Sequence, residues 1–558
     1  MTASLHSSED FKRDDRESNI LPVAPSEVEL LSVKPLPEKR HWWSFFNEYE
    51  YRDLYERNGA GHKWYHWFDE TDTPEERRYI IKLDLLITSY CFLSYWVKNL
   101  DQTNVNNAYV SGMSEELSLP SNALTKLQVM YNVGCVVFQL PFLYLFPKVR
   151  MDLLIPGLDI VWGLFTLAQY RAKSLREMMA YRFLIGCAEG PFFPGVHYVL
   201  GSWFKGHEIQ RRGGIFYMGL MLGSCTAGLL QAAILRTLDG ANGLAGWRWM
   251  FIIDAIITIP VGFIGFIIWP GTPDKLHSYF FTEQDAAIAR RRAARSGVQK
   301  SAGFSWALVK KACSSWHLPV LSFWNFLFWN SSAQGYGVFL QWLKSLDRYS
   351  TSKLNDLSAI PPALGIAYVA IACFGADIFR SRWFFLCLPQ FINWTNHVIL
   401  ATWNVPESAK WYSYMVEYNS NAMSSVLYGW INDIVRHDNE YRSVVLLIVN
   451  VIAQQSTAWT PLIFWNSSTA PSYHRGFIWG ACVSATLICW TFVVLYFFKR
   501  DERRYYFQRW NAAQEQLADW QVRDLHSDDQ GEVPPAEHDL ADEIDEKSDL
   551  QHIIAVKP

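Results

Sequence analysis

Two charged residues interrupt an apolar stretch that is long enough to cross a lipid bilayer. Residues 182–204 read RFLIGCAEGPFFPGVHYVLGSWF. Arg182 and Glu189 are seven positions apart, nearly two helical turns, so a helix presents both on about the same face, roughly 10 Å apart. A charge within a bilayer costs several kcal/mol unless it meets a partner or a cavity. This face is therefore predicted to point into the protein.

The chemistry open to these two residues is proton transfer and anion binding. Burial favours the neutral form of a carboxyl group, so Glu189 can take up and release a proton. Arg182 stays protonated and can hold a carboxylate ligand or Glu189 itself. A structural ion pair that holds spans together is the alternative. Pro191 and Pro194 are expected to kink the helix just beyond the two charges.

A second polar group lies at the end of an earlier apolar segment. Residues 95–112 read YWVKNLDQTNVNNAYVSG, in which Asp101 is the one carboxylate among several amides. An ordinary helix end at the membrane surface would also produce such a cluster, and this alternative stays open. Asp101 and Glu189 are the two predicted proton-coupling residues.

The predicted substrate contacts come from several apolar segments. They are Arg182, Asn104, His197, Asn330, Gln334, Glu417 and Gln454. Neutral amides inside membranes more often join helices than bind ligands, so each amide also has a structural interpretation. Arg248 and Asp254, near the start of a further segment, are expected to have a structural role.

These residues require helices that cross a membrane to position them. Aromatic residues make up 16% of the 558 positions and charged residues only 19%, below the roughly 25% charged residues of soluble domains. About twelve apolar segments have spanning length: 83–106, 124–147, 152–170, 177–203, 212–235, 247–270, 317–342, 358–378, 383–403, 409–434, 442–465 and 475–498. Half of them precede the polar connection 271–316 and half follow it. The sequence therefore predicts an all-α membrane protein.

Other classes of protein have no support in the sequence. The formal net charge of −4 gives no indication of a nucleic-acid surface. The 14 His residues form no HExxH pattern and no CxxC-with-His spacing, so neither a metal nor a cofactor is expected. No P-loop is present, so an ATP-driven pump is not expected. Any transport would have to be coupled to an ion gradient. No nucleophile–base pair indicates catalysis, so no enzyme activity is expected.

The charge of the central connection predicts the orientation. Its basic residues outnumber its acids Asp274, Glu283 and Asp285, and are Lys275, Arg290, Arg291, Arg292, Arg295, Lys300, Lys310 and Lys311. Basic segments favour the cytoplasm, and an even number of spans then places both termini there. Asn466, in an Asn-Ser-Ser sequon, would lie outside as a glycan site.

The two ends of the chain differ from the apolar middle. Residues 1–79 are expected to form a cytoplasmic segment that is disordered to about residue 40. Its aromatic part, 41–79, is predicted to lie at the membrane interface, with a short soluble helix pair as the alternative. Residues 499–558 are expected to form an acidic cytoplasmic tail.

Four motifs carry a resemblance to a known family. They are RFLIGCAEGPFFPG at 182–195, NLDQTNVNNAYVSG at 99–112, GWRWMFIIDAIIT at 246–258 and RRGGIFYMG at 211–219. Over about 80–498 the chain resembles the fungal anion:cation symporters of the major facilitator superfamily, the allantoate-permease group. The resemblance implies the major facilitator fold, with six-helix bundles at 80–270 and 317–498 and substrate bound between them near the midplane.

Within that group, HWWSFFNEYEYR and LDGANGLAGWRWMFIIDAI look most like the vitamin carriers for pantothenate and biotin. The resemblance implies that Asp101 and Glu189 carry protons and that Arg182 couples them to the substrate. The chain departs from the family at Gln102, where many relatives have arginine. It also departs in the loop FPKVRMDLL at 146–154, so the gating contacts of that loop in relatives are not carried over.

The sequence thus predicts a proton-coupled importer of a small organic anion at the plasma membrane. Pantothenate is the first choice of substrate and biotin the second, and another carboxylate is a further alternative. Export of a fungal metabolite and nutrient sensing with little flux also stay open. The expected partners are the anion, protons and the lipid bilayer, and a monomer is expected.

Overall fold

The computed structural model describes residues 33–36, 41–55, 68, 72–145, 148–204, 206–295, 306–436 and 439–528. The chain divides into two compact units. The membrane unit comprises Phe45–Tyr49 and Gly61–Arg500, and the terminal unit comprises Met1–Ser44, Glu50–Ala60 and Asp501–Pro558. Most of the predicted disordered start and residues 529–558 of the acidic tail lie outside the described residues, and the first part of the tail, 499–528, continues α23.

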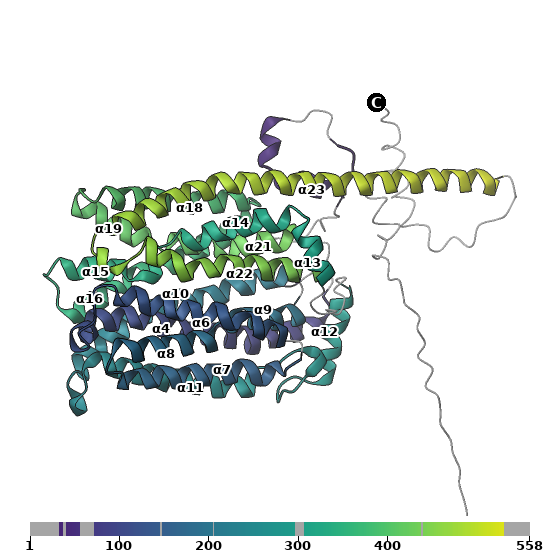
Figure 1. The fold of residues 1–558 in the computed structure, drawn as a ribbon. Helices are drawn as coiled ribbons and strands as arrows, with labels where there is room; N and C mark the ends of the chain where they lie inside the picture. Colours follow the sequence, from purple (N-terminus) through teal and green to yellow (C-terminus); the bar gives the residue numbers. More distant parts are fainter. Residues whose placement is uncertain are drawn as a thin grey trace, which may run out of the picture. The chain divides into compact units, whose positions relative to one another are not determined.

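All regular structure in the described residues is helical (Figure 1). The helices of the first half, before the central connection, are α3 (Pro74–Leu83), α4 (Ser89–Ala108), α5 (Ser114–Glu116), α6 (Ala123–Leu145), α7 (Met151–Ala168), α8 (Leu175–Glu189), α9 (Phe192–Trp203), α10 (Gly206–Thr237) and α11 (Gly246–Ile268). The central connection contains α12 (Glu283–Arg295) and α13 (Trp306–Cys313).

The second half continues with α14 (His317–Asn330), α15 (Val338–Ser345), α16 (Thr351–Ser358), α17 (Ile360–Ile378), α18 (Arg382–Thr402), α19 (Glu407–Val416), α20 (Asn419–Ala422), α21 (Ser424–Ile434), α22 (Asn439–Ile463) and α23 (His474–Asp528). The single turns are η1 (Trp42–Phe46), η2 (Asp84–Thr88), η3 (Tyr109–Met113), η4 (Gln169–Arg171), η5 (Ala241–Gly243), η6 (Pro273–Lys275), η7 (Gln334–Tyr336) and η8 (Ser467–Thr469), and α2 (Arg52–Tyr55) is in the terminal unit.

Each of the twelve predicted segments contains helix at the expected place. Seven helical stretches of the described residues are long and apolar enough to cross a membrane: Pro74–Glu116, Met151–Arg171, Arg212–Thr237, Gly246–Ile268, Thr351–Ala376, Val444–Ile463 and His474–Glu515. Several other segments are broken helices. The expected kink beyond Glu189 is one such break, because α8 ends at Glu189 and α9 starts after Pro191.

Helices α6 and α8 touch through glycine. A Cβ atom on Gly134 would overlap the carbonyl oxygen of Phe183, and one on Gly186 would overlap that of Tyr131. Small residues let membrane helices approach to backbone contact. This close crossing brings the side chain of Tyr131, on α6, beside the end of α8.

Polar contacts between the two halves gather at one end of the membrane unit. The pairs are Asn132 with Thr457, Asn355 with Ser111, Ser352 with Ala232, Arg236 with Asp356 and Lys344 with Glu115. Figure 1 shows α15 and α16 at this end and α12 and α13 at the opposite end. The structure therefore has its halves joined at the end away from the central connection.

The segment Phe45–Tyr49 packs against the start of α18. The backbone N–H of Trp383 donates to Glu48 Oε1 at 2.7 Å, and the Trp383 indole N–H donates to the Phe46 carbonyl at 2.9 Å. The N-terminal N–H groups of a helix lack partners within the helix, and the carboxyl oxygen of Glu48 supplies an acceptor to one of them. Glu48 thus acts as a cap supplied by a distant part of the chain.

The terminal unit has a small core of its own. Val33, Tyr51 and Tyr506 are buried together, and the Tyr506 hydroxyl donates to the Lys34 carbonyl at 3.0 Å. The Lys34 N–H donates to the Leu54 carbonyl at 2.7 Å. Residues on both sides of the membrane segments in the sequence therefore form one unit.

Candidate functional site

Glu189 lies at the end of α8 and is fully buried. Its Oε2 accepts hydrogen bonds from the Tyr131 hydroxyl at 2.6 Å and from Gln102 Nε2 at 3.0 Å. Its Oε1 is buried with no donor among the described residues. Gln102, the position of the departure from the family pattern, therefore contacts the predicted proton carrier directly.

Arg182 is 2% exposed and lies over the ring of Tyr131, 4.8 Å from its centroid. Its Nε and Nη1 atoms are buried and meet no acceptor in the described part of the chain. Because Tyr131 contacts both Arg182 and Glu189, the two residues point to the same side of α8, as the sequence predicts. Within the described ranges they form no ion pair with one another, so the structural ion pair is not what holds them there.

Asp101 is 1% exposed on α4, so the membrane-surface helix end does not describe its position. Thr166 Oγ1, on α7, donates to Asp101 Oδ2 at 2.6 Å. Asp254, on α11, interacts with Asp101 electrostatically. Asn104 Nδ2 donates to Asp254 Oδ2, so Asn104 contacts another side chain of the protein.

Asp254 and Arg248 have separate surroundings. Arg248 pairs with Glu116 at 2.8 Å, as a structural residue would. Asp254 is instead buried in the bundle interior, as Asp101 is.

Asp159, on α7, is a further buried carboxyl group that the sequence analysis missed. Its Oδ2 accepts from the Tyr90 hydroxyl at 2.6 Å and from Ser94 Oγ at 2.7 Å. It interacts electrostatically with Lys98 and Glu189. The available signal was an aspartate in the otherwise apolar run LLIPGLDIVWGLF at 153–165.

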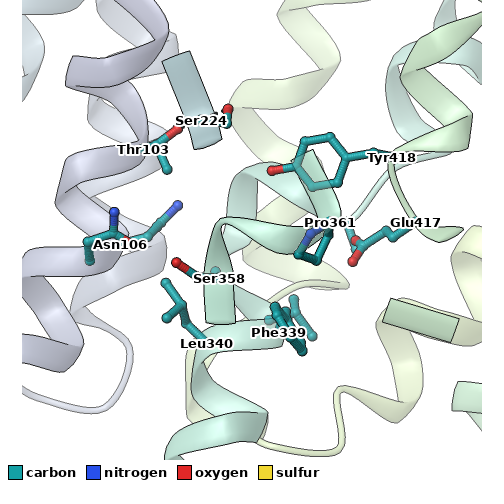
Figure 2. Close-up of a pocket in the computed structure, with 13 residues that line it drawn as sticks. Thr103, Asn106, Ser224, Phe339, Leu340, Ser358, Pro361, Glu417 and Tyr418 are labelled. Carbon is teal, nitrogen blue, oxygen red and sulfur yellow. Dashed lines mark hydrogen bonds between the residues drawn. The ribbon is translucent and has the colours of Figure 1, made fainter. Parts of the chain in front are cut away.

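A small pocket lies between helices of the two halves (Figure 2). Thr103 and Asn106 lie on one side of it, and Glu417 and Tyr418 on the other. Its remaining lining residues are Asn107, Ser224, Ala333, Gly337, Val338, Phe339, Leu340, Ser358 and Pro361. Of the predicted substrate contacts, the pocket lining includes Glu417.

Asn107 is a pocket residue that the sequence did not single out. It is fully buried, and neither Nδ2 nor Oδ1 has a partner among the described residues. The neighbouring Asn106 differs, because its Oδ1 accepts from Gln128 Nε2 at 2.7 Å. A buried amide costs about 1–3 kcal/mol when unpartnered, so Asn107 is suited to a ligand contact.

Asn330, His197 and Gln454 are not among the residues that line this pocket. Asn330 Nδ2 donates to Ser456 Oγ at 2.7 Å, a bond that joins α14 to α22. The His197 ring lies 4.2 Å from that of Phe193 on α9. Gln454 is half-buried on α22, and the side chain of Gln334 lies outside the described residues.

Asn466, the predicted glycan site, lies in the turn between α22 and α23. Its Oδ1 accepts from the Ser468 N–H at 3.0 Å. The next residue, Ser467, donates to the Ser121 carbonyl at 2.7 Å. The turn therefore lies at the end where the two halves are joined.

An all-helical chain with buried charges and a pocket between two sets of spanning helices is a multi-pass membrane protein of the carrier type. The family model described as Major Facilitator Superfamily matches residues 91–507. The chain belongs to the Major Facilitator Superfamily, and is a transporter of that family and not an enzyme. This confirms the predicted family and fold class.

Three relatives among characterised fungal proteins illustrate the similarity. The vitamin H transporter of Saccharomyces cerevisiae is 39% identical over 477 residues, which are 84% of this chain and 80% of the relative. The pantothenate transporter liz1 of Schizosaccharomyces pombe is 32% identical over 439 residues, 77% of this chain and 84% of the relative. The pantothenate transporter FEN2 of S. cerevisiae is 30% identical over 420 residues, which are 72% of this chain and 80% of the relative.

Among solved structures, the proton:xylose symporter XylE bound to 6-bromo-6-deoxy-D-glucose has a TM-score of 0.56 at 17% identity. The match covers 74% of this chain and 95% of XylE. At this identity the match supports the fold.

Proposed function

We propose that the chain imports a small carboxylate vitamin into the cell together with protons. The observation that carries this proposal is that Arg182 and Glu189, both buried on α8, do not neutralise each other within the described structure. A buried guanidinium whose Nε and Nη1 have no acceptor among the described residues favours binding of a carboxylate ligand. A buried carboxyl group that forms no ion pair with that guanidinium favours binding of a proton.

Biotin is now the first substrate to test and pantothenate the second. The sequence analysis placed pantothenate first. The vitamin H transporter, however, is 39% identical to this chain, whereas the two pantothenate transporters are 32% and 30% identical. Both vitamins are monocarboxylates with a polar body, so the same groups can serve either one.

In the proposed cycle, acidity outside the cell protonates Asp101 and Glu189. The vitamin then enters the pocket, where the Asn107 amide bonds its polar body, and Arg182 neutralises its carboxylate. Arg182 does not line the pocket in this structure, so the carboxylate reaches it when the halves rearrange. The halves rock, the protons leave to the cytosol, and the vitamin follows.

The proposed location is the plasma membrane, with both termini in the cytoplasm. The basic central connection supports a cytoplasmic position for α12 and α13. The end at which the halves are joined then faces outside, together with Asn466. The structure on this assignment is closed to the outside, as a carrier is after it has delivered its substrate.

The test is uptake of labelled biotin and labelled pantothenate by yeast cells that lack their own carriers, at about pH 5 and about pH 7.5. Uptake of one vitamin is expected to rise at acid pH and to be lost in Glu189→Gln, whose amide does not take up and release a proton in this pH range. Asn107→Ala is expected to raise the KM roughly tenfold, the loss of one hydrogen bond to the ligand.

Glu283→Gln is the matched control, because Glu283 is an exposed carboxylate that pairs with Arg290 in the central connection. Its uptake should equal that of the original chain. Absence of uptake of either vitamin, with the protein present at the cell surface, would sink the import proposal. Weight would then move to export, sensing or another anion.

A further inference from the structure

We propose that Asn107 and Glu417 form a subsite for a cyclic urea, the head group of biotin, and that this subsite favours biotin over pantothenate. The inference rests on the proposed function, because it names the part of the vitamin that the pocket between the halves holds. The pocket is small, so it is matched to one group of the substrate and not to the whole molecule. The carboxylate at the other end of the vitamin is left for Arg182, which lies outside the pocket lining.

The polar side chains around the pocket differ in the hydrogen bonds that they already make. Thr103 Oγ1 donates to Ser224 Oγ at 3.2 Å, and Ser358 Oγ donates to a backbone carbonyl at 2.7 Å. Asn106 Oδ1 accepts from a glutamine side chain at 2.7 Å. Asn107, in contrast, is fully buried, and neither its Nδ2 nor its Oδ1 has a partner in the described part of the chain. Its amide therefore offers a ligand both a donor and an acceptor.

The chemistry that matches such an amide is a planar group with a C=O beside an N–H. Asn107 Nδ2 then donates to the ligand C=O, and Oδ1 accepts from the ligand N–H, in two parallel hydrogen bonds. Amides and ureas both carry this pattern. A cyclic urea differs because its C=O has an N–H on each side, so the second N–H requires another acceptor.

Glu417 provides an acceptor from the second half of the chain. It lies between α19 and α20, is 4% exposed and lines the pocket on the side opposite Thr103 and Asn106 (Figure 2). A carboxyl group has two oxygens with several lone pairs, so it can accept from a ligand in addition to its contacts within the protein. It keeps an acceptor whether it is ionised or protonated. Asn107 and Glu417 together supply acceptors for both N–H groups of the ring.

The rest of the lining suits the apolar part of the same head group. Val338, Phe339 and Leu340, on α15, and Pro361, on α17, contribute apolar side chains. The thioether ring of biotin is fused to the urea and can pack against them. Pantothenate has one amide N–H on an open chain, so a second bond has to come from a hydroxyl, and ordering the chain costs conformational entropy. The rigid ring of biotin is therefore the better match.

The test is equilibrium binding of labelled biotin to the purified full chain in lipid nanodiscs, with unlabelled competitors. The competitors are pantothenate and two lactam analogues of biotin, in each of which CH2 replaces one of the ring N–H groups. Each analogue should bind roughly tenfold more weakly than biotin, because one acceptor is left without its donor. Pantothenate should also bind more weakly than biotin.

Asn107→Leu and Glu417→Met replace the two polar groups with apolar ones of similar size. Each variant should bind biotin roughly tenfold to a hundredfold more weakly. Each should also lose the discrimination against one of the lactams, a different one for each variant, because the N–H that this lactam lacks no longer has an acceptor. Without ligand, the unfolding midpoint of Asn107→Leu should not fall, since burying an amide that has no partner is unfavourable.

Asn396→Leu is the matched control. Asn396, on α18, is fully buried, has no partner for Nδ2 or Oδ1 among the described residues and does not line the pocket. This variant should bind biotin, both lactams and pantothenate as the original chain does. Size-exclusion chromatography checks that each variant is folded. If Asn107→Leu does not fold, Asn107→Ala provides the same comparison.

The inference is overturned if both lactams, or pantothenate, bind the original chain as tightly as biotin. It is also overturned if Asn107→Leu and Glu417→Met keep the discrimination against both lactams, or if Asn396→Leu loses it equally. If the chain binds neither vitamin, the proposed function fails, and the bare cyclic urea 2-imidazolidinone tests the subsite by saturation-transfer NMR. A signal that disappears in Asn107→Leu would leave the subsite standing, whereas an equal signal in both chains, or none, would refute it.

Discussion

The cap that Glu48 provides to α18 should loosen as the surrounding solution becomes alkaline. Burial raises the pKa of Glu48 from 4.5 to about 7, against the opposing effect of Arg382. The docked segment therefore binds the proton more tightly than the undocked one. This contribution to docking is fully present below pH 4.5 and is lost as the pH rises through about 7. A shift of this size corresponds to about 3 kcal/mol.

The assay is hydrogen–deuterium exchange of peptides that cover Phe45–Tyr49, corrected for the intrinsic effect of pH on exchange. With the two pKa values above, the docking constant falls on the order of 70-fold between about pH 5 and about pH 8. Glu48→Gln keeps an acceptor for the Trp383 N–H but has no charge to titrate. Its protection should be independent of pH over this range.

Glu407→Gln is the matched control, because Glu407 pairs with Arg348 away from this segment. It should retain the pH dependence of the original chain. The reasoning fails if protection of Phe45–Tyr49 in the original chain does not change with pH. It also fails if Glu48→Gln keeps the same dependence, because the titrating group would then lie elsewhere.

Two further predictions concern the α6–α8 crossing and the orientation. Gly186→Ala places a methyl group against the Tyr131 carbonyl and should cost about 1–3 kcal/mol, seen as a lower midpoint of thermal unfolding in detergent. Gly201→Ala, where nothing lies within 4 Å of the added atom, should leave it unchanged, and an equal loss in both would contradict the crossing. Asn466→Gln should migrate on gels like the glycosidase-treated original chain, and a glycosidase-insensitive original chain would contradict an external Asn466.

The sequence indicated candidate site residues where their spacing within a single helix was enough to relate them to one another. Arg182 and Glu189 were found because their spacing on a single span places them on a shared face. A charged side chain within a membrane is also expected to face a partner or a cavity. Asp159 was missed, and the surroundings of Asp254 could not be predicted, because each is a lone carboxylate in an apolar run. Their partners lie on α4, and spacing along one segment contains no information about which helices cross.

The same distinction, between information within one segment and information about which helices cross, applies to the fold. Apolar length predicted where the helices of the twelve apolar segments lie but not α12 and α13 of the polar connection, and Pro191 predicted the break in the span that contains Arg182. The contact of Gly134 with α8 could not be predicted, since it depends on the crossing point of two helices. The pocket could not be predicted either, because its lining comes from α4, α10 and helices of the second half, whose register is set only on packing.

The contacts that join the halves at one end also govern how strongly a ligand appears to bind from that side. A ligand arriving there can enter only the minority of molecules that are open, so its apparent affinity is lower than its intrinsic affinity by the open fraction. With roughly one molecule in a hundred open, the loss is a hundredfold. Removing contacts such as that of Asn355 with Ser111 enlarges the open population. Such variants should bind an external ligand more tightly although none of the changed residues touches it.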